Sequence, residues 1–124
     1  MTRPTVLVVE DDQIARDIAR LACAELGCAV TEAEDGEKAL KLARKNVPDL
    51  ILLDLALPGL DGWEVARRLR ASARTREVPI VAVTAHVLKE GLDEALAAGV
   101  RECLLKPYRV RQLQDLVRKY LPET

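Results

Sequence analysis

The chain has 124 residues, of which 49% are hydrophobic and 31% are charged. This length suits one compact domain whose core needs neither a disulfide nor a metal to fold. Its 19 basic and 20 acidic side chains leave a formal charge of −1, which excludes a nucleic-acid binder that relies on strong positive charge, and also an acidic disordered tail. Aromatic residues make up only 2%, too few for a platform that stacks single-stranded bases.

The cysteines and the N-terminal residues indicate where the protein works. Cys23, Cys28 and Cys103 are odd in number and lack the paired spacing of a zinc site, so we expect small buried thiols in a reducing compartment. The apolar run after Pro4 is too short for a signal sequence or a membrane-spanning helix. We therefore expect a cytoplasmic protein with one domain over residues 1–124.

Short apolar runs alternate with longer amphipathic segments along the chain. The runs predict five strands, at Thr5–Val9, Ala29–Ala33, Leu50–Leu53, Ile80–Val83 and Cys103–Leu105. The first, third and fourth are almost continuously apolar, which is typical of central parallel strands covered on both faces. The second contains polar residues and the fifth directly follows two charged residues, so these two are expected at the edges of the sheet.

Helical periodicity of apolar residues predicts a helix after each strand. The expected helices are Gln13–Leu26, Glu37–Lys45, the segment from Asp61 through Arg70, Val87–Ala98, and the segment from Val110 through Tyr120. Asp12 and Asp61 are expected to cap two of them, and Gly27 to end the first. With right-handed crossovers, this order predicts an α/β fold, a doubly wound five-stranded parallel sheet of order 2-1-3-4-5, which is the flavodoxin-like (βα)5 arrangement.

Charged and hydroxyl side chains follow the predicted strands at their carboxyl ends, where such sheets bind ligands. Glu10 and Asp11 follow the first strand, Asp54 the third, Thr84 the fourth and Lys106 the fifth. Neighbouring strands lie about 4.8 Å apart, so the carboxylates should converge. Two like charges about 5 Å apart repel by roughly 3 kcal/mol at an effective dielectric constant near 20. The cluster therefore predicts a bound cation or a shifted pKa.

The composition of this cluster indicates a metal and a reaction. Lys106 offsets one negative charge, and Mg²⁺ suits the remainder because few carboxylates leave coordination positions for water or a phosphoryl oxygen. A carboxylate can attack phosphorus and form an aspartyl phosphate. Asp54 is central, and the hydroxyl of Thr84 and the ammonium of Lys106 could hold phosphoryl oxygens. A solvated sheet end without chemistry is the alternative, and the joint occurrence of these groups favours the site.

Four motifs in this order resemble a known family. They are Val6–Asp12, Asp49–Gly62, Thr84-Ala85 and Lys106-Pro107. Over nearly the whole chain the sequence resembles the response-regulator receiver domains of two-component signalling, including single-domain chemotaxis regulators. This resemblance implies that Glu10, Asp11 and Asp54 bind Mg²⁺, together with the backbone carbonyl of Ala56.

The resemblance also implies roles for the other residues. Asp54 would be the phosphoacceptor, Thr84 the hydroxyl that moves toward the phosphoryl group, and Lys106 the lysine that pairs with it. The Lys106-Pro107 bond would be cis, although only about 5–6% of X–Pro bonds in folded proteins are. Such a domain catalyses its own phosphorylation and dephosphorylation, and we expect no dedicated turnover enzyme.

The partners implied are a sensor histidine kinase or a histidine phosphotransfer protein as donor, and a downstream protein target. Phosphorylation would shift the fourth helix, the fifth strand and the fifth helix, and so control that target. No direct nucleic-acid or membrane partner is expected. As a whole protein the chain would act as a relay, a phosphate sink or a switch; as part of a larger regulator it would control another domain.

One residue departs from the family pattern, and two others lie at positions that modulate the site. Cys103 stands where the family often has an aromatic switch residue, so a mechanism in which a ring swings inward cannot hold unchanged; Tyr108 is the nearest ring. Ala56 and His86 occupy positions that influence the lifetime of the acyl phosphate in the family. We expect Cys103 to be a packing residue and His86 to lie in an exposed loop.

Alternative functions remain open at this level. A degenerate receiver would bind partners without phosphorylation. A Mg²⁺-dependent aspartyl phosphohydrolase would often carry an Asp at the position of Ala56, and a nucleotide-binding module would need a Gly-rich phosphate loop that is absent. Five arginines within Arg67–Arg76 predict a solvated helix face, with a docking patch for an acidic partner as the alternative.

Overall fold

A computed structural model describes residues 3–85 and 89–122. Its strands are β1 (Thr5–Val9), β2 (Ala29–Ala33), β3 (Leu50–Leu53), β4 (Ile80–Thr84) and β5 (Glu102–Leu105). Its helices are α1 (Gln13–Glu25), α2 (Gly36–Lys45), α3 (Gly62–Ala71), α4 (Lys89–Ala97) and α5 (Val110–Tyr120). The predicted elements are confirmed to within one or two residues, although the first residues predicted for the fourth helix lie outside the described part of the chain.

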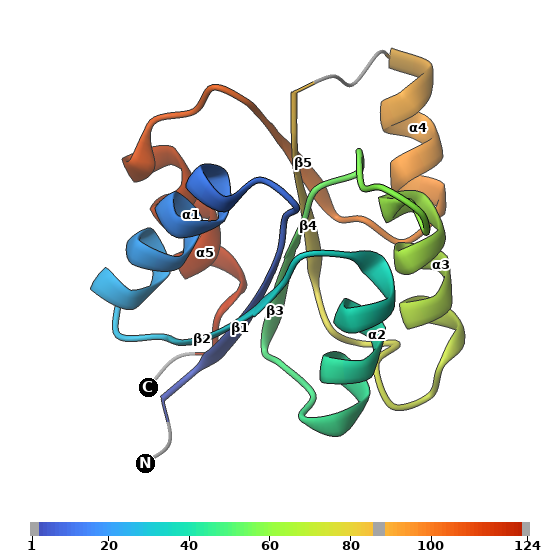
Figure 1. Ribbon diagram of the computed structural model, residues 1–124, viewed down its shortest axis with the longest axis horizontal. Coiled ribbons are helices and arrows are strands. Elements are labelled where there is room, and N and C mark those ends of the chain that lie inside the picture. The colour runs from blue at the N-terminus through green and yellow to red at the C-terminus, as the bar shows by residue number, and fades with distance from the viewer. Residues whose placement is uncertain (1–2, 86–88, 123–124) are drawn as a thin grey trace.

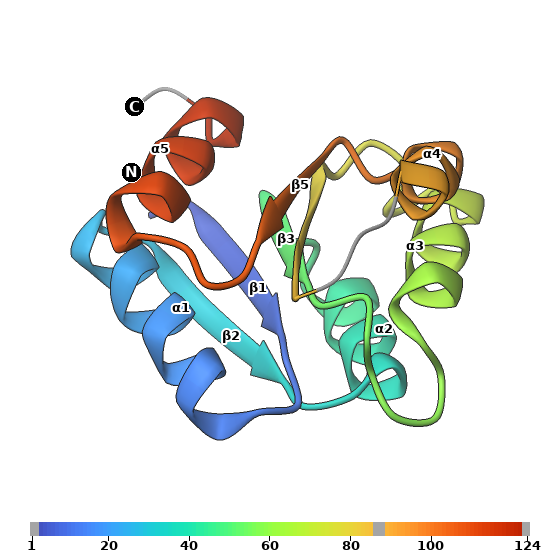
Figure 2. The same ribbon diagram turned by 90° about the horizontal axis from the view of Figure 1, so that it is seen from above.

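The five strands form one parallel sheet in the order β2-β1-β3-β4-β5, which confirms the predicted α/β fold. Helices α1 and α5 cover one face of the sheet, and α2, α3 and α4 cover the other (Figures 1 and 2). Among the helices of the described residues, none combines the length and the apolar character that crossing a membrane requires.

The alternation of side chains along the central strands divides the core into two layers. In β1, Leu7 and Val9 pack into the layer toward α2, α3 and α4, whereas Val6 and Val8 pack into the layer toward α1 and α5. All four residues of β3 are buried. Burial on both faces is the physical reason why these strands read as continuous apolar runs in the sequence.

Local hydrogen bonds define where the helices begin. Asp12 Oδ2 accepts a hydrogen bond from Ala15 N at 2.8 Å, and Asp61 Oδ1 accepts one from Glu64 N at 2.9 Å, which confirms both predicted caps. Gly27, with φ of 86°, adopts the left-handed conformation just after α1. The cap at Asp12 starts α1 directly after β1 and so holds the intervening acidic residues at the end of the sheet.

Candidate functional site

The register of the central strands brings Glu10 and Asp54 side by side. Val9 pairs with Leu53, and Asp54 N donates to Val9 O at 3.0 Å. By strand alternation, the side chains of Glu10 and Asp54 continue the layer that faces α1 and α5. Two residues separated by 44 positions in the chain thus come together at the carboxyl end of the sheet.

Three carboxylates converge at this edge, as predicted. Glu10, Asp11 and Asp54 each offer one oxygen, and these oxygens lie within 4.8 Å of one another. Glu10 and Asp54 are buried, whereas Asp11 is exposed. All the donors are hard oxygen atoms and one side of the cluster is open, so the residues fit a Mg²⁺ ion that keeps part of its water.

Lys106 joins the cluster from the other side of β4. It follows β5, whose last residue Leu105 pairs with Thr84. Its Nζ lies 3.3 Å from Asp54 Oδ2 and also donates a hydrogen bond to Glu10 Oε1. The expected offset of negative charge by Lys106 is confirmed.

The pKa of the Glu10 carboxyl is raised to about 7, mainly by burial and to a lesser extent by the nearby charge of Asp54. The hydrogen bonds from Lys106 and from the Asp12 amide act in the opposite direction and lower this pKa. The shifted pKa was expected, but its main cause is different. The sequence predicts repulsion between carboxylates as the cause, whereas the loss of water around Glu10 contributes more to the raised pKa.

Backbone amides orient the two buried carboxylates. Glu10 Oε2 accepts a hydrogen bond from Asp12 N at 3.2 Å, and Asp54 Oδ1 accepts one from Ala56 N at 2.9 Å. Each amide lies two residues after the carboxylate that it contacts. The turns after β1 and β3 therefore set the direction of the side chains, and each carboxylate has one oxygen tied to its own turn.

Of the other predicted site residues, the structure describes Thr84 and Ala56. Thr84 ends β4 and is buried; alternation along β4 directs its side chain to the face opposite Val83, toward the core layer of α3 and α4. Ala56 is exposed in the turn after β3. His86 lies outside the described residues.

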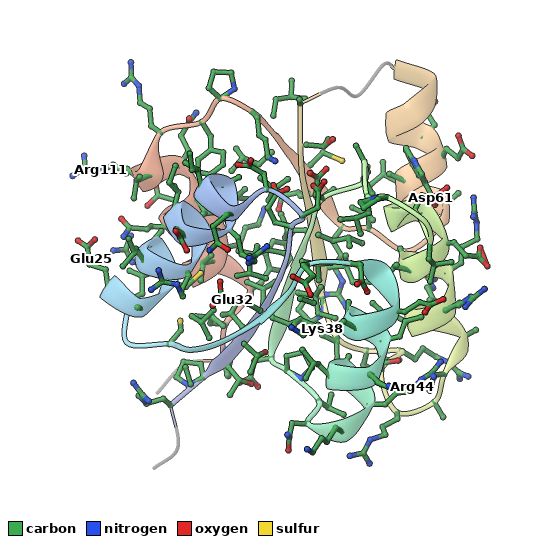
Figure 3. The ribbon with its side chains drawn as sticks, viewed as in Figure 1. Glu25, Glu32, Lys38, Arg44, Asp61 and Arg111 are labelled. Atoms are coloured by element: carbon green, nitrogen blue, oxygen red, sulfur yellow. The ribbon has the colours of Figure 1, made fainter. Side chains whose placement is uncertain are left out.

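Arg16, which was not predicted from the sequence as part of the site, holds the turn after β1 in place. Its Nη1 donates to the backbone oxygen of Glu10 at 2.8 Å, and its Nε lies 3.3 Å from Glu32 Oε1. Figure 3 labels Glu32, which β2 presents beneath α1. The sequence does show an arginine in the first helical turn after the acidic residues. Its acidic partner, Glu32, lies on a separate strand, so the contact cannot be predicted from the local sequence.

Gly62 is a second residue that sequence analysis did not connect with the site. A Cβ at this position would lie 2.5 Å from both Asp54 O and Leu55 Cα. Gly62 N also donates to Leu55 O at 3.1 Å. The first turn of α3 is thus pressed against the backbone that carries Asp54, and only glycine allows this approach. The Asp-Gly pair at residues 61–62 was the signal in the sequence.

Cys103 and Tyr108 pack on opposite sides of the sheet. Cys103 is half-buried against the layer of α2, α3 and α4, and Tyr108 is half-buried against the layer of α1 and α5. Burial raises the pKa of both side chains. The position of Cys103 agrees with the packing role expected from the sequence. The Lys106-Pro107 peptide bond is cis, as the family resemblance implied.

A family model described as the response regulator receiver domain matches residues 6–118. The chain therefore belongs to the receiver domain family, whose members are phosphorylation-dependent response regulators of two-component signalling and bind Mg²⁺ at an acidic pocket.

Comparisons with individual proteins give the same family. The transcriptional regulatory protein AfsQ1 of Streptomyces coelicolor is 39% identical over 118 residues, which are 95% of this chain and 51% of that protein. The chain thus spans about half the length of that relative. Among solved structures, the chemotaxis protein CheY4 of Vibrio cholerae has a TM-score of 0.92 at 28% identity, with 97% of this chain and 100% of that chain covered.

A third comparison concerns the metal. The receiver domain of the sensor histidine kinase PA1611 of Pseudomonas aeruginosa is 34% identical, with a TM-score of 0.88 over 96% of this chain and 98% of that chain. Its structure contains a magnesium ion coordinated in the active site cleft. The acidic cluster of the present chain fits the same ion by its donor chemistry.

Proposed function

We propose that the chain is a phosphorylation-dependent signalling switch in which Asp54 accepts a phosphoryl group. The donor is a phosphohistidine of a sensor histidine kinase or of a histidine phosphotransfer protein, and we place the reaction in the cytoplasm. One observation carries the proposal: the buried carboxylate of Asp54 has oxygens of Glu10 and Asp11 within 4.8 Å and the Lys106 ammonium at 3.3 Å.

In the proposed reaction, an oxygen of Asp54 attacks phosphorus and forms the O–P bond of an acyl phosphate. The P–N bond to the histidine breaks, its electron pair stays on the imidazole nitrogen, and that nitrogen takes a proton as it leaves. Glu10, Asp11, Asp54 and the backbone carbonyl of Ala56 would hold Mg²⁺, which supplies positive charge against the phosphoryl oxygens when bound.

Two groups of the chain would stabilise the same oxygens. The Lys106 ammonium, already beside Asp54, offers hydrogen bonds to a phosphoryl oxygen. The Thr84 hydroxyl would reach another oxygen from the end of β4. Later attack of water on phosphorus breaks the O–P bond, releases phosphate and returns Asp54 to its carboxylate form.

We infer that the output face is formed by α4, β5 and α5. A phosphoryl group adds a charge of about −1.5 to −2 and three acceptor oxygens. Thr84 and Lys106 stand at the ends of β4 and β5, so a movement of either side chain toward the phosphoryl group changes packing along those strands. The surface next to them then presents a different shape to a downstream protein.

Mass spectrometry after incubation with acetyl phosphate and Mg²⁺ tests this function. The wild-type chain should gain one phosphoryl group, and Asp54→Asn should gain none. Asp35→Asn is a matched control, because Asp35 caps α2 through Lys38 N at 2.8 Å and Asn caps helices about as well. The control should be labelled like the wild type.

The other outcomes distinguish the alternative functions. Equal labelling of Asp54→Asn and wild type would contradict the assignment of the acceptor. Rapid release of phosphate over many turnovers would indicate a phosphohydrolase. No labelling with any donor, in a folded protein, would indicate a receiver that binds partners without phosphorylation.

A further inference from the structure

A cavity of about 300 Å³ lies at the end of the sheet opposite the acidic cluster. Val78 and Ile80 line it, and Ile80 is the first residue of β4, whereas Thr84 beside the cluster is the last. Its volume is at the lower end of the range for small-molecule sites. The cavity is therefore separate from the proposed site of phosphorylation.

Three arginines from three segments line this cavity. Arg70 belongs to α3, Arg76 to the connection before β4, and Arg101 precedes β5. Among the side chains that the structure describes, no carboxylate lies within ion-pair distance of any of them. The neighbouring arginines on α3 differ, since Arg67 and Arg68 both pair with Glu64.

The hydrogen bonds of these arginines leave most of their donors available. Arg76 Nε donates to Arg70 O and Arg101 Nη2 donates to Glu77 O, both at the long distance of 3.4 Å. A guanidinium has five N–H donors. Glu77 is the acidic residue in the lining, so the lining carries a net charge of +2.

The backbone around the cavity is held by specific contacts. The stem of Arg70 lies over Gly99, where an added Cβ would be 2.6 Å from Arg70 Cδ. Thr75 is buried, and its Oγ1 donates to Leu69 O at 2.6 Å. These contacts fix the helix end and the turn that carry the arginines, which lowers the entropic cost of binding a ligand.

We propose that this cavity binds a small polyanion that carries two adjacent phosphate groups. Guanidinium groups bind phosphate through paired hydrogen bonds. Three guanidinium groups around one cavity offer more donors and more positive charge than a ligand with a single negative charge would use. Arg74, one residue before Thr75 of the lining, adds a further cation to the connection before β4.

Isothermal titration calorimetry with pyrophosphate, without divalent ions, tests the proposal. We expect saturable binding of one pyrophosphate per chain, with a dissociation constant below about 1 mM. The double variant Arg76→Gln/Arg101→Gln should bind at least about tenfold more weakly. The matched control Arg68→Gln/Arg111→Gln removes the same charge outside the cavity and should stay within about twofold of the wild type.

Equal weakening in the two double variants would overturn the proposal, because it would show attraction to net charge alone. No binding of pyrophosphate up to about 10 mM would also overturn it. If an acidic peptide binds instead and the cavity variant abolishes that binding, the arginines serve a protein partner, and the small-anion proposal is wrong. None of these results depends on phosphorylation of Asp54.

Discussion

Lys106 Nζ lies 3.3 Å from Asp54 Oδ2, although β4 stands between the strands that carry these two residues. The lysine reaches Asp54 across β4 because its side chain is long. The same ammonium contacts Glu10. One cation thus neutralises part of the charge of two buried carboxylates, and this relationship leads to the first prediction.

Lys106→Met should separate metal binding from phosphorylation. Loss of the ammonium leaves more negative charge at the cluster, so Mg²⁺ should bind about tenfold more tightly. Phosphorylation by acetyl phosphate should slow by about 100-fold or more, because a group that stabilises the transferring charge is gone. Titration with Mg²⁺, followed by Trp63 fluorescence or calorimetry, and mass spectrometry over time measure the two effects.

Lys119→Met is the control for this prediction. Lys119 lies on α5, away from the cluster. Its Nζ lies 2.9 Å from Glu102 Oε2 at the start of β5. Its loss should change neither the Mg²⁺ affinity nor the rate of phosphorylation by more than about twofold. Weaker Mg²⁺ binding in Lys106→Met would show that the lysine mainly holds the carboxylates in position.

Gly62→Ala should destabilise the domain by about 3 kcal/mol, because its Cβ would meet the backbone of Asp54 and Leu55 at 2.5 Å. Gly27→Ala is the comparison. Gly27 has φ of 86° but nothing within 4 Å of the added Cβ, so its cost should stay at the 1–2 kcal/mol typical of a left-handed residue, roughly half as much. Urea denaturation measures both, and a larger loss in Gly27→Ala would contradict the close approach.

Tyr120→Phe should have a pH-dependent effect on stability. The Tyr120 hydroxyl and Lys119 both donate to Glu102, and these hydrogen bonds lower the pKa of Glu102. A pKa that is lower in the folded state stabilises the fold above the unfolded pKa, and the benefit is lost as the pH falls through the folded pKa.

The loss in Tyr120→Phe should therefore be below about 1 kcal/mol near neutral pH, since Glu102 is partly exposed, and should vanish as the pH falls through the pKa of Glu102 in the folded protein. Urea denaturation of both proteins over this range gives the difference in the free energy of unfolding. A loss that stays constant with pH would assign the effect to packing of the ring.

The three cysteines should react with thiol reagents at different rates. Burial raises the pKa of the Cys23 thiol to about 12, and it also raises the pKa values of Cys28 and Cys103. Cys103 is partly exposed, whereas the other two are buried. Since the thiolate is the reactive form, Cys103 should be labelled first and Cys23 last, at least about tenfold more slowly. Peptide mass spectrometry measures the order, and equal rates would show local opening around α1.

Several features of this protein follow from the sequence alone because their causes are local. The apolar runs of β1, β3 and β4 reflect burial on both faces, and Asp12 and Asp61 cap helices through amides three residues away. The convergence of Glu10 and Asp54 also follows, because parallel strands bring their carboxyl ends to one edge of the sheet.

Other features depend on contacts between distant segments, which only the tertiary structure decides. Arg16 reaches Glu32 on another strand, and the depth of burial makes lost hydration, rather than repulsion, the main cause of the raised pKa of Glu10. The arginines near Arg70 are exposed, as the sequence predicts, but only the packing of α3 against Gly99 places Arg70 and Arg101 around one cavity. Local sequence pattern specifies which residues lie at a strand end or on a helix, whereas packing between elements decides which side chains from remote positions meet and how much water surrounds them.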